Sequence, residues 1–325
     1  MENSKRFLIV NPAASSGKAG KRWPQVKQQL LAQGLSFNYQ LTGGPGDATE
    51  FARQALHKGY TVIVAVGGDG TLNEVANGFF QVDEKTRSQA ALGLIPEGTG
   101  GDFARLMNIP RNIKVCADRI AREDIRPIDV AHARYHLKCG NSGDSGDSGG
   151  SRDSADETST RYFCNTADVG LGGATIALTH RLRKYMGGFL SYYVAMVLSM
   201  LFYQNREITA VIDDCEAWTG KTVTLVVANG QYFGGGMKIT PTALPDDGLL
   251  DVLLVADMSK FRLLFNSHRV YKGTHLDIKG VELFQGRKIC IQSAESNVLF
   301  ELDGEYLGRA PVEIRILPGA LRFIV

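Results

Sequence analysis

The run with the clearest capacity for chemistry is Val62 to Phe79, VIVAVGGDGTLNEVANGF, in which an apolar strand leads through glycines into a helix. Glycines lack a Cβ and let backbone N–H groups approach phosphate oxygens, and a helix N-terminus adds about half a positive charge there. Asp69 stands in the middle of this turn, where a bare carboxylate would repel phosphate. A divalent cation removes that conflict, so Asp69 is predicted to be a ligand, direct or through water, of nucleotide-bound Mg²⁺.

Two common phosphate-binding motifs do not account for this turn. The P-loop pattern GxxxxGK[ST] fails because Gly17 and Lys18 are followed by Ala19 and preceded at the required spacing by Pro12. The dinucleotide pattern GxGxxG fails because Asn73 occupies the position of its third glycine. A turn that merely needs glycine would explain the glycines but not the carboxylate.

Two further loops follow strands of the same predicted sheet. The first is residues 11–17, NPAASSG, which is polar and small enough for nucleotide contact. The second is Pro96 to Arg105, PEGTGGDFAR, where glycines again permit close approach and Asp102 supplies a second carboxylate. Ligands gather at the carboxyl ends of parallel strands, so the three loops together indicate one nucleotide site.

The elements that must position these loops alternate between strands and helices over residues 1–128. Asp47 and Glu50 have the spacing of a capping box at the start of one helix. Short apolar strands alternating with helices predict an α/β nucleotide-binding domain with a parallel sheet. The predicted strands are 6–10, 37–41, 61–66 and 91–95, and the predicted helices are 21–31, 47–58 and 71–80.

Residues 129–325 have longer β-branched and alternating runs, which predict a β-rich, antiparallel, sandwich-like second domain. Residues 139–160 have almost no apolar content, so we expect a disordered insertion, with a regulatory phosphorylation loop as the alternative. A return of the extreme C-terminus to the first domain is left open. The predicted strands are 128–137, 161–169, 207–212, 222–227, 249–255, 288–293, 298–302 and 312–317.

Composition narrows the class of protein and its location. A formal charge of +2 over 325 residues lacks the basic footprint of a nucleic-acid binder. Five scattered cysteines without a CxxC pair fit a reducing cytoplasm, and the N-terminus lacks the pattern of a signal peptide. The uncharged stretch 187–203 is expected to form a buried or membrane-facing helix, with a transmembrane helix as the lesser alternative. The preceding cluster of His180, Arg181, Arg183 and Lys184 fits either anionic headgroups or a solvated helix end.

These motifs resemble the diacylglycerol kinase catalytic-domain family in its bacterial lipid-kinase branch, which is related to sphingosine and ceramide kinases. GGDG alone would be shared with NAD kinases and phosphofructokinases, whereas GGDGTLNEV at 67–75 followed by PEGTGGDFAR at 96–105 is specific. The resemblance continues through 165–173, 229–252 and the DGE of Asp303 to Glu305. One departure is Gly101, where the family usually has Asn, so a side-chain contact to substrate or nucleotide is expected to be absent.

The resemblance implies ATP as co-substrate, an active site in a cleft between the domains, and Glu305 as the base that deprotonates a lipid hydroxyl. Asp-Gly also favours a hairpin turn, which would present Glu305. The resemblance further implies a structural Mg²⁺ site at the Asp247 carboxylate and the carbonyls of Leu244 and Leu249. Asp102 is expected to assist Asp69 at the nucleotide-bound Mg²⁺. The expected ATP contacts are Asn11, Pro12, Ser16, Gly17, Thr42, Gly67, Gly68, Gly70, Thr71, Asn73, Glu74, Gly98 and Thr99.

The sequence therefore predicts a kinase that transfers the ATP γ-phosphate to a membrane lipid, with diacylglycerol the leading substrate and phosphatidic acid the product. Phosphatidylglycerol or a sphingoid base is the next alternative, followed by an NAD kinase and a catalytically inactive nucleotide- or lipid-binding regulator. We expect a cytoplasmic protein with peripheral membrane contact and no nucleic-acid partner. A homodimer is left open.

Overall fold

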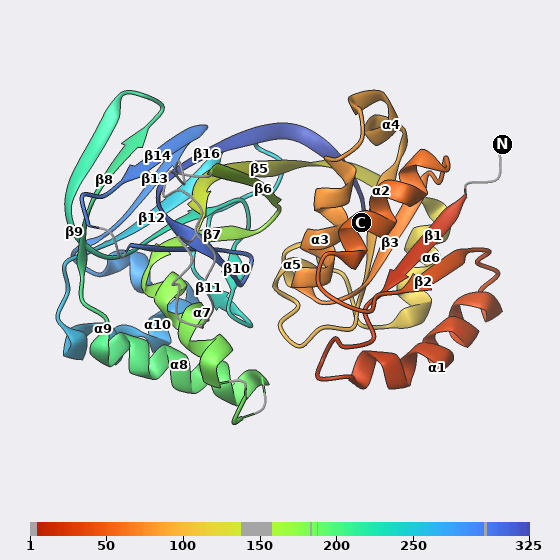
Figure 1. Cartoon of the computed structure of the whole chain (residues 1–325), viewed down its shortest axis with the longest axis horizontal. Coiled ribbons are helices and arrows are strands. Elements are labelled where there is room, and N and C mark those ends of the chain that lie inside the picture. The colour runs from red at the N-terminus through yellow and green to blue at the C-terminus, as the bar shows by residue number, and fades with distance from the viewer. Residues whose placement is uncertain (1–4, 138–157, 183, 187, 296–297) are drawn as a thin grey trace, which may run out of the picture.

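The computed structural model describes residues 5–137, 158–182, 184–186, 188–295 and 298–325, which form two halves joined by long strands (Figure 1). Helices lie between the strands along the first half, as predicted, with two helices in succession after β3 and again after β4. Its elements are β1 (Arg6–Val10), α1 (Lys18–Ala32), β2 (Asn38–Leu41), α2 (Asp47–His57), β3 (Val62–Gly67), α3 (Asp69–Phe79), α4 (Glu84–Gln89), β4 (Ala91–Pro96), α5 (Asp102–Leu106) and α6 (Ile113–Arg122).

The strands of the first half pair with one another in parallel, in the order β4, β3, β1, β2. All residues of β3 and β4 are buried, which matches their nearly continuous apolar sequences VIVAVG and ALGLIP. Because the strands run in one direction, the loops that follow β1, β3 and β4 leave the sheet at the same edge. This edge holds the three loops that the sequence assigns to nucleotide binding.

The second half is built mainly from antiparallel strands with helices beside them. Alternate residues such as Val169, Leu225 and Ile314 point into a shared apolar core, as in a sandwich. Its elements are β5 (Ile125–Leu137), β6 (Thr158–Phe163), β7 (Thr166–Gly170), α7 (Leu171–Leu182), α8 (Gly188–Phe202), β8 (Arg206–Ile212), β9 (Glu216–Ala228), β10 (Tyr232–Phe233), β11 (Met237–Lys238), β12 (Leu250–Ala256), α9 (Lys260–Asn266), α10 (His268–Lys272), a 3₁₀ turn at His275–Asp277, β13 (Val281–Gly286), β14 (Lys288–Gln292), β15 (Leu299–Leu302) and β16 (Glu305–Ile324).

Two long strands, β5 and β16, connect the halves and pair antiparallel along most of their length (Figure 1). The end of β16 then pairs in parallel with β4, at Phe323 and Leu92. Phe323 and Ile324 are buried in the core of the first half, so the C-terminal strand does return there. The predicted boundary at residue 128 falls inside β5, and the core changes from that of the first half to that of the second between Val130 and Ala131.

Two local predictions were wrong. The stretch 161–169 is not one strand, because β6 pairs with β5 whereas β7 pairs with β9 and β15. The chain crosses between these partners at Asn165, whose carbonyl accepts the N–H groups of Asn229 and Gly230. The capping box also fails, since Asp47 Oδ2 accepts the N–H groups of Gly43 and Gly44 instead of capping the helix.

The predicted insertion at 139–160 lies outside the described residues except for 158–160, which begin β6. The apolar stretch at 187–203 contains α8, as predicted. Among the described residues, no helix combines the length and the apolarity needed to cross a bilayer.

The role of the C-terminal strand in the first core is testable by replacing Phe323 with Ala. Phe323 is fully buried, and its ring meets that of Phe103 edge-on with centroids 5.1 Å apart. The cavity left by Phe323→Ala should lower the free energy of unfolding in urea by about 3–5 kcal/mol. Leu31→Ala, at a side chain 52% exposed on α1, is the control and should change it by no more than about 0.5 kcal/mol. Equal stability of the two variants would contradict this account of the core.

Candidate active site

The three glycine-containing loops lie against one another at the carboxyl edge of the parallel strands. Asn11 Nδ2 donates to Thr71 Oγ1 at 3.0 Å, which ties the loop after β1 to the start of α3. Ser15 Oγ donates to the Glu97 carbonyl at 2.7 Å, which ties the same loop to the one after β4. Four of the predicted ATP contacts lie in the first loop, and others lie elsewhere on this edge. Those in the first loop are Asn11, Pro12, Ser16 and Gly17, and those elsewhere are Thr42, Gly67, Gly68, Gly70, Thr71, Gly98 and Thr99.

Two glycines in these loops have structural reasons of their own. A Cβ on Gly98 would lie 2.3 Å from the Cα of Gly68, so the two loops approach backbone to backbone. Gly101 has φ 64°, a left-handed conformation that favours glycine and that asparagine also tolerates. The Asn that is usual in the resembled family and the Gly of this chain therefore suit the same backbone. The glycine content follows partly from loop packing and not only from phosphate binding.

Asp69 is the first residue of α3, and its carboxylate lies at the start of α5. Its Oδ1 accepts the N–H of Phe103 at 3.1 Å and its Oδ2 accepts the N–H of Asp102 at 3.2 Å. The Asp102 carboxylate is buried, pairs with Arg105 at 2.6 Å and accepts the N–H of Gly235 at 2.7 Å. Burial, and less strongly the charge of Asp69, raise the pKa of Asp102. Asp69 thus also positions α5, a role that sequence reasoning missed.

This pair of carboxylates fits a Mg²⁺ ion that shares its ligands with a nucleotide. Mg²⁺ commonly takes one or two carboxylates and completes its shell with phosphate oxygens and waters. Two neighbouring negative side chains on the edge that is predicted to bind phosphate have the donor type for such an ion. In the parts of the chain that the structure describes, no three His, Cys, Asp or Glu side chains gather as a metal cluster, so a cage built only from side chains is not indicated.

The second predicted cation site lies in the turn before β12. Asp247 is exposed there, and its Oδ1 accepts the N–H of Leu249 at 3.0 Å. Buried Asp129 lies beneath the turn and accepts the N–H of Gly248 at 2.6 Å. Burial is the main reason that the pKa of Asp129 is raised, and Asp247 adds to it. Asp247 has the oxygen donor that Mg²⁺ prefers, and its ligation together with the Leu244 and Leu249 carbonyls stays a prediction.

The DGE turn between β15 and β16 is attached to the first half by its aspartate. Asp303 and Gly304 have φ values of 46° and 83°, as a tight hairpin turn requires. Asp303 Oδ1 accepts the Thr166 N–H at 2.9 Å, and Asp303 Oδ2 accepts Asn73 Nδ2 at 2.8 Å. Burial raises the pKa of Asp303 to about 7. The hydrogen bond between Asn73 and Asp303 joins residues 230 positions apart and fixes the turn to α3.

Glu305 follows this turn and forms an ion pair with Arg161 of β6 at 2.8 Å. The Glu305 side chain is 39% exposed, which leaves it open to a substrate. Partial burial raises the pKa of Glu305 and the Arg161 guanidinium opposes that rise. Arg161 also lies 3.4 Å from Asn73 Oδ1, so Arg161, Asn73, Asp303 and Glu305 form one connected group from both halves.

Glu74 and Asn73, which are also among the predicted ATP contacts, have protein partners as well. Glu74 Oε2 accepts the N–H groups of Gly46 and Ala48 at 3.0 and 3.2 Å, which caps the start of α2. Asn73 is only 3% exposed and uses its amide to join the halves. Arg161 was missed because nothing in its sequence neighbourhood indicates a partner 144 residues away.

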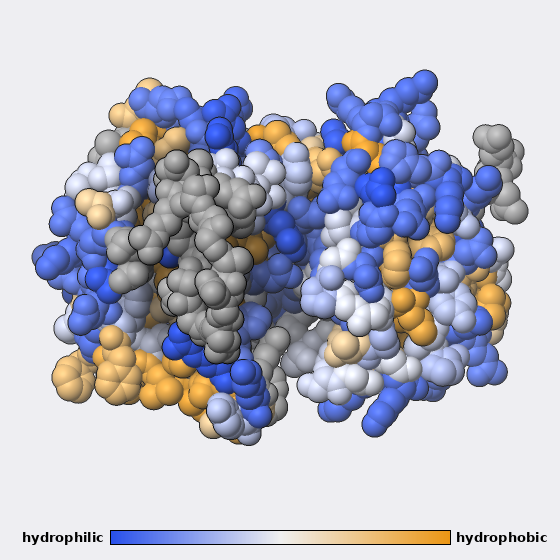
Figure 2. All heavy atoms as spheres, in the orientation of Figure 1, coloured by the Kyte–Doolittle hydropathy of each residue, from blue (hydrophilic) through white to orange (hydrophobic). Residues whose placement is uncertain are grey.

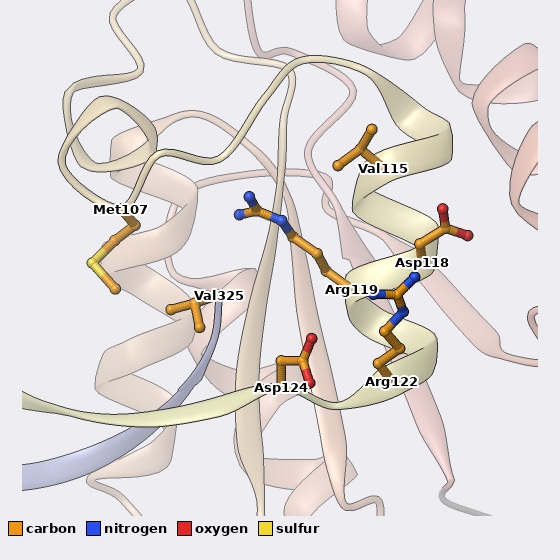
Figure 3. A pocket seen from close by; sticks show the side chains of 7 residues that line it. All are labelled: Met107, Val115, Asp118, Arg119, Arg122, Asp124 and Val325. Atoms are coloured by element: carbon orange, nitrogen blue, oxygen red, sulfur yellow. The ribbon is translucent and has the colours of Figure 1, made fainter.

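A pocket of about 410 Å³ lies on the first half, apart from all of the predicted site residues (Figure 3). Its charged side chains are two arginines and two aspartates, so their charges balance and indicate no class of ligand. The lining residues are Met107, Val115, Asp118, Arg119, Arg122, Asp124 and Val325.

Comparison with known proteins covers both halves. Residues 5–133 match the profile of the diacylglycerol kinase catalytic domain, and residues 166–325 match that of the YegS C-terminal NAD kinase beta sandwich-like domain. A diacylglycerol kinase of Bacillus subtilis is 27% identical over 94% of this chain and 91% of its own length. A protein named "Probable lipid kinase YegS-like" from Cronobacter sakazakii is 29% identical over 97% of this chain and 94% of its own length.

The fold is also found in a solved structure. The crystal structure of a diacylglycerol kinase from Bacillus anthracis superposes with a TM-score of 0.73 at 24% identity, covering 100% of this chain and 98% of that one. The two profiles together span most of the chain, one matching its first half and the other its second half. Residues 5–133 belong to the diacylglycerol kinase catalytic-domain family and residues 166–325 to the YegS C-terminal domain family, and over nearly its whole length the chain is similar to bacterial lipid kinases.

Proposed function

We propose that this chain transfers the γ-phosphate of ATP to the hydroxyl of a membrane lipid, with diacylglycerol as the acceptor and phosphatidic acid as the product. The observation that carries the proposal is the 2.8 Å hydrogen bond from Asn73 to Asp303. It fixes the turn that bears Glu305 to the helix that begins at Asp69. Asn73 follows Asp69 by one helical turn, about 6 Å along the axis. A carboxylate suited to a metal–nucleotide and one suited to a base therefore belong to one rigid unit.

The nucleotide end of the proposed reaction uses the edge formed by the loops after β1, β3 and β4. The N-terminus of α3 points its partial positive charge at this edge, which favours phosphate oxygens. Mg²⁺, held by Asp69 with Asp102 nearby, would supply charge neutralisation at the phosphates. The contacts of Asn11 and Ser15 with neighbouring loops keep this edge in one shape.

The acceptor end depends on Glu305. The lipid hydroxyl oxygen forms a bond to the γ-phosphorus while the bond from that phosphorus to the β–γ bridging oxygen breaks, and ADP leaves. Glu305 takes the hydroxyl proton as this bond forms. Arg161 orients the Glu305 carboxylate, and its positive charge opposes the rise in the Glu305 pKa that burial causes. Arg161 is thus a positioning residue, since it acts through Glu305.

One specific observation keeps an NAD kinase as the second candidate. The profile that matches residues 166–325 is described as NAD kinase beta sandwich-like, so the fold of the second half does not exclude that acceptor. Phosphatidylglycerol and sphingoid bases also offer a hydroxyl to Glu305. An inactive regulator is disfavoured because the chain keeps both Asp69 and Glu305.

The proposal predicts the product of a direct assay. Purified protein with Mg²⁺ and γ-labelled ATP should label diacylglycerol in mixed micelles, and the labelled lipid should co-migrate with phosphatidic acid in chromatography. Phosphatidylglycerol, a sphingoid base and NAD serve as competing acceptors in parallel reactions. Label in NADP, or no transfer to any acceptor despite ATP binding, would refute the proposed function.

Amide replacements separate the roles of the two carboxylates. Asp69→Asn should remove Mg²⁺-dependent ATP affinity in calorimetry, because the neutral amide is a poor ligand for a divalent cation. Glu305→Gln should keep that affinity and lower kcat by about 10²–10⁴-fold, the usual contribution of a general base. Thermal melting checks that both variants are folded. Near-normal turnover in Glu305→Gln would remove this residue from its role.

The ion pair with Arg161 predicts a pH effect. A base works when deprotonated, so kcat/KM should rise with pH through the pKa of Glu305, which burial places above the ordinary value of 4.5. Arg161→Gln removes the cation that lowers this pKa, so the acid limb of the profile should move to higher pH. Arg315→Gln, which breaks the 2.8 Å ion pair with Glu313 elsewhere on β16, is the matched control. Superimposable profiles for the two variants would contradict the positioning role.

A further inference from the structure

Helix α8 turns small side chains toward the protein and large apolar side chains toward the solvent, the reverse of an ordinary surface helix. Among the residues of α8 whose side chains the structure describes, the buried ones are Ser191, Ala195 and Ser199, spaced by four residues. Leu190 and Phe202 are large and apolar yet 54% and 76% exposed. A surface helix normally turns its large apolar stripe to the core and its small polar residues outward. The outer side of α8 is therefore built for an apolar environment.

The neighbouring helix α9 also exposes large apolar side chains. Phe261, Leu264 and Phe265 lie at positions i, i+3 and i+4, and so share one side of the helix. Phe261 is 88% exposed and Phe265 is 81% exposed, and Tyr271 of α10 is 52% exposed. We call the exposed sides of α8, α9 and α10 the helical face. Figure 2 shows a hydrophobic band at the lower left, where Figure 1 places α8 and α9.

The charge on these helices has one sign. Residues 171–206 and 258–276 contain no Asp or Glu, although the chain has 34 of them. The same segments hold exposed basic side chains, which are Arg181, Lys184, Arg262 and Lys272. Exposed aromatic rings beside Lys and Arg are the combination with which peripheral proteins enter the interface of an anionic bilayer. A second copy docked isologously would bring equal positive charges together, which disfavours a dimer through this face.

We propose that the helical face docks the chain on a bilayer that contains anionic lipid, with Phe261 and Phe265 entering the interfacial region. The purpose of this contact rests on the proposed lipid substrate, but the contact itself does not require ATP or transfer. The face is linked to the candidate site through the hairpin of β10 and β11. A Cβ on Gly273, which follows α10, would lie 3.4 Å from Lys238 Cδ of β11. In the same hairpin, Gly235 donates its N–H to Asp102.

The docking surface is tested by co-sedimentation of the full chain with vesicles of phosphatidylcholine alone or mixed with phosphatidylglycerol, without nucleotide. The wild type should bind the anionic vesicles and remain largely free with neutral ones. Phe261→Ser/Phe265→Ser should weaken binding by about tenfold or more, because two rings no longer leave water. Leu31→Ser/Val115→Ser changes two exposed apolar side chains of the first half and should bind as the wild type does.

Equal binding by the two double variants would overturn the proposal, and so would a wild type that binds neither kind of vesicle; the second result would leave the face to an acidic protein partner. A soluble, short-chain diacylglycerol separates this outcome from failure of the proposed function. Phe261→Ser/Phe265→Ser should phosphorylate that monomeric substrate at the wild-type rate and lose activity only on vesicles. A wild type that binds vesicles and phosphorylates no lipid would refute the kinase proposal and leave the docking surface intact.

Discussion

The arrangement of the site depends on one buried contact, in which the Asn73 amide donates to the Asp303 carboxylate. An amide and a carboxylate buried without partners would each be costly, so the two halves are held in the register that lets these groups meet. Asn73 belongs to the helix that follows the glycine turn, and Asp303 belongs to the turn that precedes Glu305. The contact therefore fixes the position of the proposed base, Glu305, relative to the sheet edge that is predicted to bind the nucleotide. Arg161 of β6 adds a further connection through its ion pair with Glu305.

The same region concentrates negative charge to a degree that needs an explanation. Asp69, Asp102 and the pair Asp303 and Glu305 come from three separate segments, and backbone N–H groups or arginines satisfy them in the structure. Burial raises the pKa of Asp102, Asp303 and Glu305, and shifts of this kind are common among the carboxylates of functional sites. Carboxylates at a phosphate-binding edge become favourable once a divalent cation is shared with the phosphates. The concentration of carboxylates therefore favours a metal–nucleotide over a bare phosphate ester as the ligand.

Sequence alone was sufficient for the parts of the fold that follow from local periodicity. The apolar runs at 62–67 and 91–96 are buried strands because their patterns admit little else. The sequence could not predict that the stretch 161–169 divides into β6 and β7 at Asn165, because that break depends on which strands lie beside each segment. The hydrogen-bond partners of Asp47 and Glu74 were also not predictable. The local pattern predicted a capping box for Asp47, and the family resemblance implied a nucleotide contact for Glu74. The contacts that organise the candidate site span 230 and 144 residues, and periodicity carries no information over such distances.

The orientation of the helices in the helical face could also not be predicted from sequence. The apolar content of residues 187–203 predicted a helix, but content does not say which side of a helix faces the protein. That side became evident only when Ser191, Ala195 and Ser199 were found to be buried, which leaves the larger side chains outside. Exposed rings cost free energy in water, so a fold retains them where another phase or partner covers them. Because the adjoining segments carry basic residues and no carboxylates, an anionic bilayer satisfies both the apolar and the electrostatic requirement, whereas a purely apolar partner would satisfy only the first.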